Sequence, residues 1–89
     1  MIEKKIIIKN KLGLHARAAV KFVNLANRFR SSVKIEKDGN EIDGKSILGI
    51  LTLVAVQGTQ IKLKVSGKDE DSALRALVAL VNNKFHESE

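Results

Sequence analysis

Two short segments of this chain alternate between apolar and polar residues, and this pattern constrains the fold more than any other feature. The apolar members are Val33 and Ile35 within residues 32–37, and Ile61, Leu63 and Val65 within residues 60–66. Because successive side chains of a strand point to opposite faces, the alternation predicts a sheet with one buried and one solvated face, which is typical of antiparallel sheets. Asp38-Gly39 predicts a tight hairpin turn after the first segment, since that turn requires positive φ, and residues 40–43 are the expected returning strand.

Apolar residues at helical spacing complete the pattern of elements. Residues 16–29 predict an amphipathic helix, and a last helix is expected to begin at the acidic residues 69–71 and to carry Phe85 in its apolar stripe. Ser46 is the expected cap of a short helix, and the β-branched residues 2–9 predict a first strand. The order strand, helix, strand, strand, short helix, strand, helix predicts an α+β fold with helices packed on one face of an antiparallel sheet.

Composition restricts the function more than the fold. The chain has 89 residues, of which 44% are hydrophobic and 29% charged, and this predicts a single globular domain over residues 1–89. It has no cysteine and only two histidines, which lie far apart, so we expect neither a metal site nor a cofactor. The 16 basic and 10 acidic side chains give a net charge of +6, which favours acidic or phosphorylated partners.

Nucleic acids and membranes are not the expected partners. Three phenylalanines are the only aromatic residues, so the chain lacks the aromatic platforms of single-stranded nucleic-acid binders. The alternative, a basic α/β nucleic-acid binder, predicts weak and strongly salt-dependent binding. The longest run without charge, residues 46–61, is too short and too polar to span a bilayer, and the first residues contain no cleavable apolar stretch. We therefore expect a cytoplasmic monomer with no membrane insertion.

His15 lies at the predicted start of the first long helix. Histidine is not among the preferred capping residues, so the first amides of that helix are expected to be unpaired. The backbone amides of Ala16 and Arg17 would then form an anion site. The Arg17 guanidinium adds a fixed positive charge, and the same field favours a neutral imidazole with a nucleophilic ring nitrogen. No acid is linked to His15 by the sequence, and His86 is expected to lie in a solvated tail. The alternative is an ordinary surface histidine.

The segment after Ser46 is the second candidate for function. Residues 47–54 contain more apolar side chains than a short helix can bury, so we expect Leu48 and one neighbour to form a small exposed patch. Val20, one turn from Arg17, is expected to join this surface. The alternative is that the domain buries all of these side chains. Ser46 is most simply a helix cap, and a phosphate placed there would also be stabilised by the helix start.

Both regions resemble signatures of HPr, the histidine-containing phosphocarrier family of the bacterial sugar phosphotransferase system. Residues 10–19 are similar to its active-site signature, and residues 45–58 to the segment around its regulatory serine. The resemblance implies an open-faced β-sandwich with a four-stranded antiparallel sheet and three helices on one face. Ala18 stands where many members have proline, which implies a slightly looser helix start with the chemistry intact. The stretch Val54-Ala55-Val56 is bulkier than the glycine-containing one often found there.

The resemblance also implies roles for individual residues. His15 would accept a phosphoryl group from enzyme I, which is charged by phosphoenolpyruvate, and pass it to IIA domains of sugar permeases, while Arg17 stabilises the phosphohistidine. Such a chain is a covalent carrier and not an autonomous catalyst. The partner-docking residues would be Val20, Ile47, Leu48 and Leu51. Ser46 matches the site that an HPr kinase/phosphorylase modifies in many bacteria. The alternative is a regulatory interaction protein that acts through phosphorylated Ser46 without sugar transport.

Overall fold

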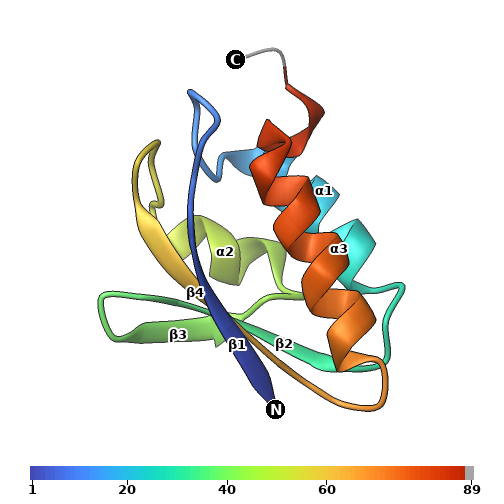
Figure 1. Cartoon of the computed structure of the whole chain (residues 1–89). Helices are drawn as coiled ribbons and strands as arrows, with labels where there is room; N and C mark the ends of the chain where they lie inside the picture. The colour runs from blue at the N-terminus through green and yellow to red at the C-terminus, as the bar shows by residue number, and fades with distance from the viewer. Residues whose placement is uncertain (88–89) are drawn as a thin grey trace.

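The computed structural model describes residues 1–87 and contains one antiparallel sheet of four strands. The strands are β1 (Ile2–Ile7), β2 (Ser32–Lys37), β3 (Asn40–Asp43) and β4 (Gln60–Ser66), in the spatial order β1-β4-β2-β3 (Figure 1). The bounds of β2, β3 and β4 are those predicted from the alternation and the hairpin turn. β4 is a central strand, and its register places Val65 between Ile2 of β1 and Val33 of β2.

Three helices cover one face of this sheet. They are α1 (Ala16–Ala26), α2 (Ile47–Thr52) and α3 (Glu70–Asn82) (Figure 1). α3 packs against β1, β4 and α1, whereas α2 packs against α1 and β3. The expected α+β fold, an open-faced β-sandwich with a four-stranded antiparallel sheet and three helices, is confirmed.

Both long helices end earlier than their apolar spacing predicts. α1 ends at Ala26, and Phe29 belongs to a following turn in which its N–H donates to the Ala26 carbonyl at 3.1 Å. α3 ends at Asn82, and Phe85 lies instead in a short 3-10 turn, η1 (Lys84–His86). The Phe85 side chain is nevertheless fully buried. The spacing therefore predicted the burial of Phe85 correctly, although the backbone carrying it is not helical.

One hydrophobic core lies between the sheet and the helices. Its largest fully buried side chains are Phe22, Phe85, Ile8, Ile35, Ile50, Ile61, Leu63 and Leu77. Burying an aliphatic or aromatic side chain of this size contributes about 1.5–3 kcal/mol relative to leaving it exposed. Because β1, α1 and η1 all contribute to this core, it fixes the loop before α1 and the end of the described chain on a common scaffold.

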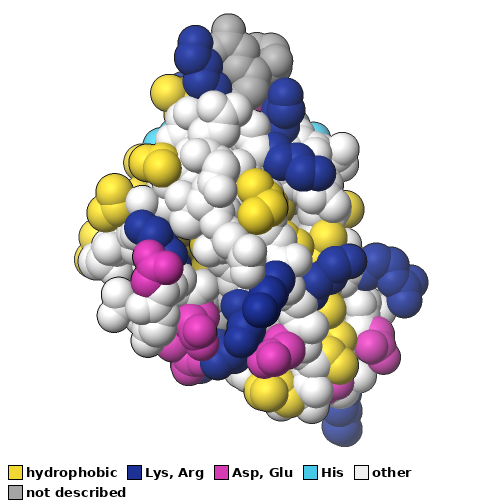
Figure 2. Space-filling model, turned by 60° about the vertical axis from the view of Figure 1, so that its left-hand side comes forward, with side chains coloured by type: hydrophobic (Ala, Val, Ile, Leu, Met, Phe, Trp, Pro, Cys, Tyr) yellow, Lys and Arg dark blue, Asp and Glu magenta, His cyan; other side chains and the backbone are white. Residues whose placement is uncertain are grey.

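The opposite face of the sheet is covered by charged side chains. Lys64 of β4 forms ion pairs with Glu36 of β2 at 2.7 Å and with Glu41 of β3 at 2.9 Å. The hydrogen bond from Lys64 is the main reason why the pKa of Glu36 lies below its usual value. Figure 2 shows a surface on which Lys and Arg side chains are interspersed with Asp and Glu over its lower part. Positive charge on the sheet face is therefore partly neutralised by neighbouring acids.

Candidate functional site

His15 is the residue immediately before the first turn of α1. Its backbone is extended, with φ −77° and ψ 178°, and its carbonyl accepts a helical hydrogen bond from Ala19 N at 2.9 Å. Its ring nitrogen Nδ1 accepts a hydrogen bond from the Arg17 backbone N–H at 3.3 Å. The first amides of this helix were expected to lack partners, and for the Arg17 amide this expectation was wrong. The imidazole itself takes the place of the usual serine or aspartate cap.

The loop between β1 and α1 holds His15 in position. Gly13 has a φ of +68°, and a Cβ on it would lie 2.4 Å from the Ala55 carbonyl oxygen, so only glycine fits there. The next amide, Leu14 N, donates to the same oxygen at 2.8 Å. Asn10 is fully buried, and its Nδ2 donates to the Gly13 carbonyl at 2.7 Å. The loop is thus fastened to the segment after α2 and delivers His15 to the helix start in a defined position.

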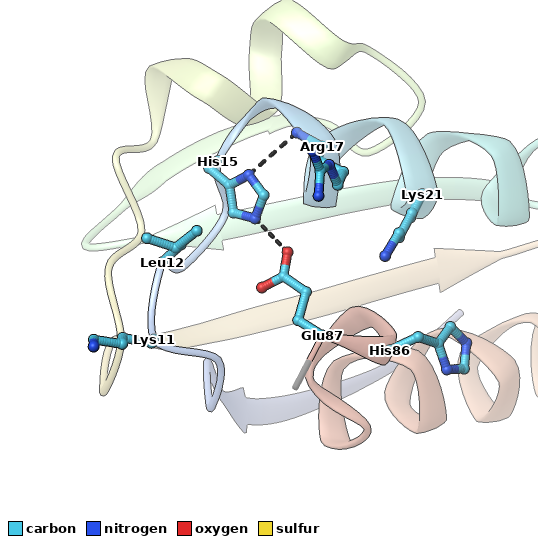
Figure 3. A pocket seen from close by; sticks show the side chains of 7 residues that line it. All are labelled: Lys11, Leu12, His15, Arg17, Lys21, His86 and Glu87. Carbon is cyan, nitrogen blue, oxygen red and sulfur yellow. Dashed lines mark hydrogen bonds and ion pairs between the residues drawn. The ribbon is translucent and has the colours of Figure 1, made fainter. Parts of the chain in front are cut away.

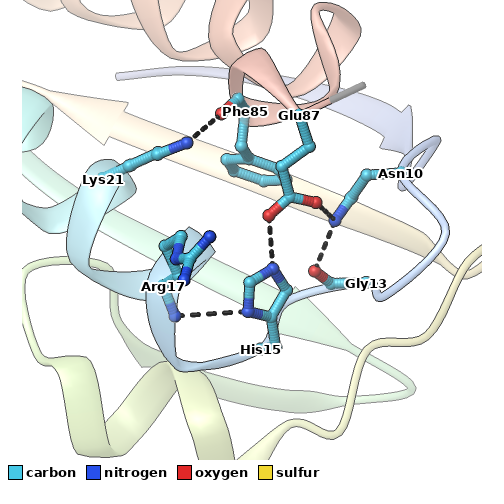
Figure 4. Close-up of polar contacts among 7 residues, drawn as sticks. All are labelled: Asn10, Gly13, His15, Arg17, Lys21, Phe85 and Glu87. Carbon is cyan, nitrogen blue, oxygen red and sulfur yellow. Dashed lines mark hydrogen bonds and ion pairs between the residues drawn. The ribbon is translucent and has the colours of Figure 1, made fainter. Parts of the chain in front are cut away.

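An acid from the end of the described chain lies against the imidazole. Glu87 Oε2 accepts a hydrogen bond from His15 Nε2, and Glu87 Oε1 accepts one from Asn10 Nδ2 at 3.0 Å (Figure 4). Nothing in the sequence links an acid to His15, whereas the fold places one beside its ring. His86 is exposed, as predicted, but the side chain of Glu87 is only 16% exposed and is not part of a solvated tail. Glu87 is 72 residues from His15 and continues no periodic pattern, so the sequence carried no signal for this contact.

The η1 turn directs Glu87 back toward α1. All three of its residues have a left-handed backbone, with φ between 56° and 62°. The turn is anchored by the buried ring of Phe85, and Lys21 Nζ of α1 donates a hydrogen bond to the Phe85 carbonyl at 2.6 Å. Packing and one charge-assisted hydrogen bond therefore fix the carboxylate beside the helix start.

The pKa of Glu87 lies below its usual value. Partial burial is the largest single influence and acts to raise the pKa, but it is outweighed by hydrogen bonds from His15 and Asn10 together with attraction to His15 and Lys21. Glu87 is therefore ionised at neutral pH and can only accept hydrogen bonds. The His15 nitrogen that faces it must carry a hydrogen.

His15 lines a shallow hollow of about 630 Å³ (Figure 3). The lining side chains are Lys11, Leu12, His15, Arg17, Lys21, His86 and Glu87. Lysine and arginine outnumber the single acid among these residues, so the hollow attracts anions. Arg17 is exposed and forms no ion pair within residues 1–87. Its guanidinium is available to an incoming anionic group.

The expected docking residues lie on α1 and α2, which pack against each other beside the hollow. Their exposed fractions are 40% for Val20, 37% for Ile47 and 77% for Leu48, and Leu51 is half-buried. The expectation that Leu48 and a neighbour face solvent is therefore confirmed, and the alternative that all are buried is wrong. The structure also exposes Leu12, Val54 and Val56, which the sequence analysis did not single out as surface residues.

Ser46 caps α2, as its position in the sequence predicted. Its Oγ accepts a hydrogen bond from Gly49 N at 3.0 Å, and its carbonyl accepts one from Ile50 N at 3.0 Å. The side chain is half-buried. A hydroxyl at this place stabilises the short helix that carries Ile47 and Leu48.

Among residues 1–87, no three histidine, cysteine, aspartate or glutamate side chains are grouped so that they could hold a metal ion. No helix within the same residues has the length and apolar character needed to cross a membrane.

Comparison with known proteins identifies the family. Residues 2–83 match the family described as "PTS HPr component phosphorylation site". The phosphocarrier protein HPr of Neisseria meningitidis is 47% identical over 89 residues, which cover 100% of both chains. The crystal structure of HPr-C-His from Thermoanaerobacter tengcongensis matches this structure with a TM-score of 0.96 at 47% identity, again over 100% of both chains. The chain belongs to the HPr family.

Membership of the HPr family makes this chain a phosphocarrier of the phosphotransferase system and confirms the resemblance seen in the sequence. It does not favour the alternative of a purely regulatory protein. A further HPr structure from Thermoanaerobacter tengcongensis is a dimer, with a TM-score of 0.79 and 48% identity over 98% of this chain and 100% of that chain. The expectation of a monomer therefore stays a prediction.

Proposed function

We propose that His15 accepts a phosphoryl group from phosphorylated enzyme I and passes it to IIA domains of sugar permeases. The observation that carries this proposal is the meeting of an imidazole, a helix start and an exposed guanidinium in one cationic hollow. Phosphoenolpyruvate is the source of the phosphoryl group on enzyme I. The chain is a covalent carrier, because it returns to its starting state only when a second protein takes the group.

The hydrogen bonds of His15 identify the nitrogen that reacts. Nε2 faces the ionised Glu87 and therefore carries the proton. Nδ1 accepts from the Arg17 N–H and therefore carries the lone pair. Since the nitrogen with the lone pair is the nucleophile, Nδ1 forms the bond to phosphorus.

The start of α1 stabilises the charge that arrives on Nδ1. The backbone amides of Ala16 and Arg17 lie at the positive end of the helix dipole. Once Nδ1 is phosphorylated, the Arg17 N–H has lost its acceptor there and donates to a phosphoryl oxygen instead. The exposed Arg17 guanidinium adds charge-assisted donors. These groups are in place before the reaction and need little reorganisation during it.

Partner docking uses the apolar surface next to the hollow. The exposed Val20, Ile47 and Leu48, with the half-buried Leu51, supply the contact area, and the surrounding cations favour acidic partner surfaces. Neither nucleic acid nor membrane insertion has a part in this scheme. A monomer leaves the docking surface open, so we expect light scattering to give the single-chain mass of 9.8 kDa. A dimer that covers Leu48 would contradict this.

Phosphorylation of Ser46 would regulate the same surface. Ser46 immediately precedes the exposed Ile47 and Leu48. A phosphate there adds negative charge beside a surface that binds acidic partners, and it therefore opposes docking and transfer. An HPr kinase/phosphorylase is the expected modifying enzyme where a cell has one.

The proposal is tested by incubating the chain with phosphoenolpyruvate and a purified enzyme I. Intact mass and mapping of acid-labile phosphate should place one phosphoryl group on His15. His15→Ala should abolish it, whereas Ser46→Ala should retain it, at a cost of about 1 kcal/mol in stability from the lost helix cap. Labelling that persists in the folded His15→Ala protein, or the absence of labelling in the wild-type chain, would contradict the proposal.

A further inference from the structure

The carboxylate of Glu87 connects the imidazole to the buried loop before α1. Its Oε2 accepts from His15 Nε2 and its Oε1 from Asn10 Nδ2 at 3.0 Å (Figure 4). Asn10 is fully buried and donates also to the Gly13 carbonyl, so its amide nitrogen cannot turn away without losing two hydrogen bonds. Asn10 therefore fixes the position of the carboxylate, and the carboxylate fixes the imidazole.

These contacts also select one tautomer of the neutral ring. A carboxylate only accepts hydrogen bonds, so Nε2 must donate, whereas the Arg17 backbone N–H only donates, so Nδ1 must accept. The Arg17 bond is long, at 3.3 Å. The charged bond to Glu87 is therefore the stronger of the two determinants.

We propose that Glu87 is a positioning residue for phosphoryl transfer, which orients the His15 ring and keeps the proton on Nε2 so that Nδ1 is free to react. This inference rests on the proposed phosphorylation of His15. It assigns a role to a side chain that neither family signature contains. Glu87 itself does not touch the phosphoryl group.

The transfer step is balanced without a further reactant. The Nδ1 lone pair forms the bond to phosphorus while the bond between phosphorus and the donor atom breaks, and the donor atom keeps the electron pair. Nε2 keeps its proton, so the phosphorylated ring carries a positive charge. That charge arises next to the carboxylate of Glu87, which stabilises it. When the acceptor protein takes the phosphoryl group, the ring returns to the neutral Nε2–H tautomer.

Charged neighbours do not duplicate this role. The other charged or titratable side chains that line the hollow are Lys11 from the loop, Arg17 and Lys21 from α1, and His86 from η1. None of them is an acid, so none can accept a hydrogen bond from Nε2–H as an anion. Among the lining residues, all of which the structure describes, Glu87 alone provides an acceptor of this kind.

A glutamine at position 87 has one oxygen that accepts and one NH2 group that donates, so it cannot accept hydrogen bonds from both Asn10 and His15 as the carboxylate does. Asn10 Nδ2 still needs an acceptor, which directs the glutamine oxygen to Asn10 and its amide NH2 group to His15. An NH2 group facing Nε2 favours a lone pair on that nitrogen and a proton on Nδ1. The variant should therefore lose the reactive tautomer, although the shape of the side chain is nearly unchanged.

The test compares Glu87→Gln with Glu3→Gln, which makes the same chemical change at an exposed site on β1. The ¹⁵N NMR spectrum of the unphosphorylated proteins at about pH 8 reports which ring nitrogen of His15 carries the proton. Glu87→Gln should lose the pure Nε2–H signature, and enzyme I should phosphorylate it about tenfold more slowly. Glu3→Gln should match the wild type in both measurements.

Each other outcome counts against the inference. A wild-type tautomer and rate in Glu87→Gln would overturn it, as would a changed tautomer with an unchanged rate. A slower rate with the wild-type tautomer would assign Glu87 to docking instead of ring positioning. Failure of the wild-type chain to become phosphorylated would overturn the proposed function itself, and the NMR measurement keeps that failure separate from the question of the tautomer.

Discussion

Val54 has a φ of 51°, in the left-handed region that β-branched residues rarely adopt. Its side chain is 67% exposed, so burial offsets little of the strain. This backbone conformation costs an L-residue roughly 1–2 kcal/mol, and glycine avoids that cost. Glycine also gives the unfolded chain more conformational entropy, which stabilises the unfolded state by roughly 0.4–1 kcal/mol. We expect Val54→Gly to raise the free energy of unfolding by about 0.5–1 kcal/mol, as measured by urea denaturation.

Val56→Gly is the matched control for this prediction. Val56 is similarly exposed, at 59%, but its φ is not positive. Glycine there relieves no strain and only adds entropy to the unfolded chain, so the variant should be less stable by about 0.5–1 kcal/mol. A Val54→Gly protein that is destabilised like Val56→Gly would show that Val54 is not strained.

Single residues of the site differ in how far the sequence could predict them. His15 and Arg17 stand together at a helix start, and their side-chain chemistry predicts an anion site there, with an ordinary surface histidine as the alternative. Glu87 could not be found in this way, because its contact with His15 depends on three consecutive left-handed residues after α3 and on the burial of Phe85. These features depend on tertiary structure and produce no periodic pattern in the amino-acid sequence.

At the scale of elements, Asp69 joins two segments rather than capping its own helix. Its carboxylate accepts hydrogen bonds from the Arg30 and Ser31 backbone amides, each at 2.9 Å, and from the Ser31 hydroxyl. The hydroxyl bond is the leading reason why the pKa of Asp69 is lowered to about 2, followed by the Arg30 amide. The start of α3 is thereby tied to the turn between α1 and β2.

This contact predicts how stability changes with pH. A carboxylate whose pKa is lower in the folded state stabilises the fold above its unfolded value of about 3.9, and this contribution is lost as the pH falls toward the folded value. The stability difference between wild type and Asp69→Asn should therefore be largest above about pH 5 and shrink toward about pH 2 in urea denaturation. Asp71→Asn, at an exposed site in the first turn of α3, should differ less from the wild type in stability. A difference for Asp69→Asn that does not vary with pH would contradict the role of ionised Asp69.

The elements themselves were largely predictable, and their pairing was not. Alternation in β2 and β4 decides which side chains face the core, because a shift by one residue would expose every apolar side chain. The same alternation does not say that β4 lies between β1 and β2, since that order depends on contacts between distant parts of the chain. Helix ends were also missed, because Phe85 reaches the core from a turn as well as it would from a helix.

At the scale of the whole molecule, the net charge of +6 is distributed unevenly. Lysines on the open face of the sheet pair with acids, as Lys64 does with Glu36 and Glu41. Among the described residues that line the hollow around His15, two lysines and an arginine stand against one acid. The charge excess near the site should steer acidic partner surfaces toward His15, and such steering is weakened by salt.

Arg28→Gln and Lys34→Gln separate steering from net charge, because each lowers the charge of the chain by one. Arg28 is exposed in the turn that follows α1, whereas Lys34 lies on β2. Arg28→Gln should slow phosphorylation by enzyme I about threefold at low salt, and Lys34→Gln should slow it less. Both differences should disappear near 1 M salt, where the screening length is about 3 Å. Equal effects of the two variants would show that net charge alone controls the encounter, and a rate that does not depend on salt would show that steering has no part in it.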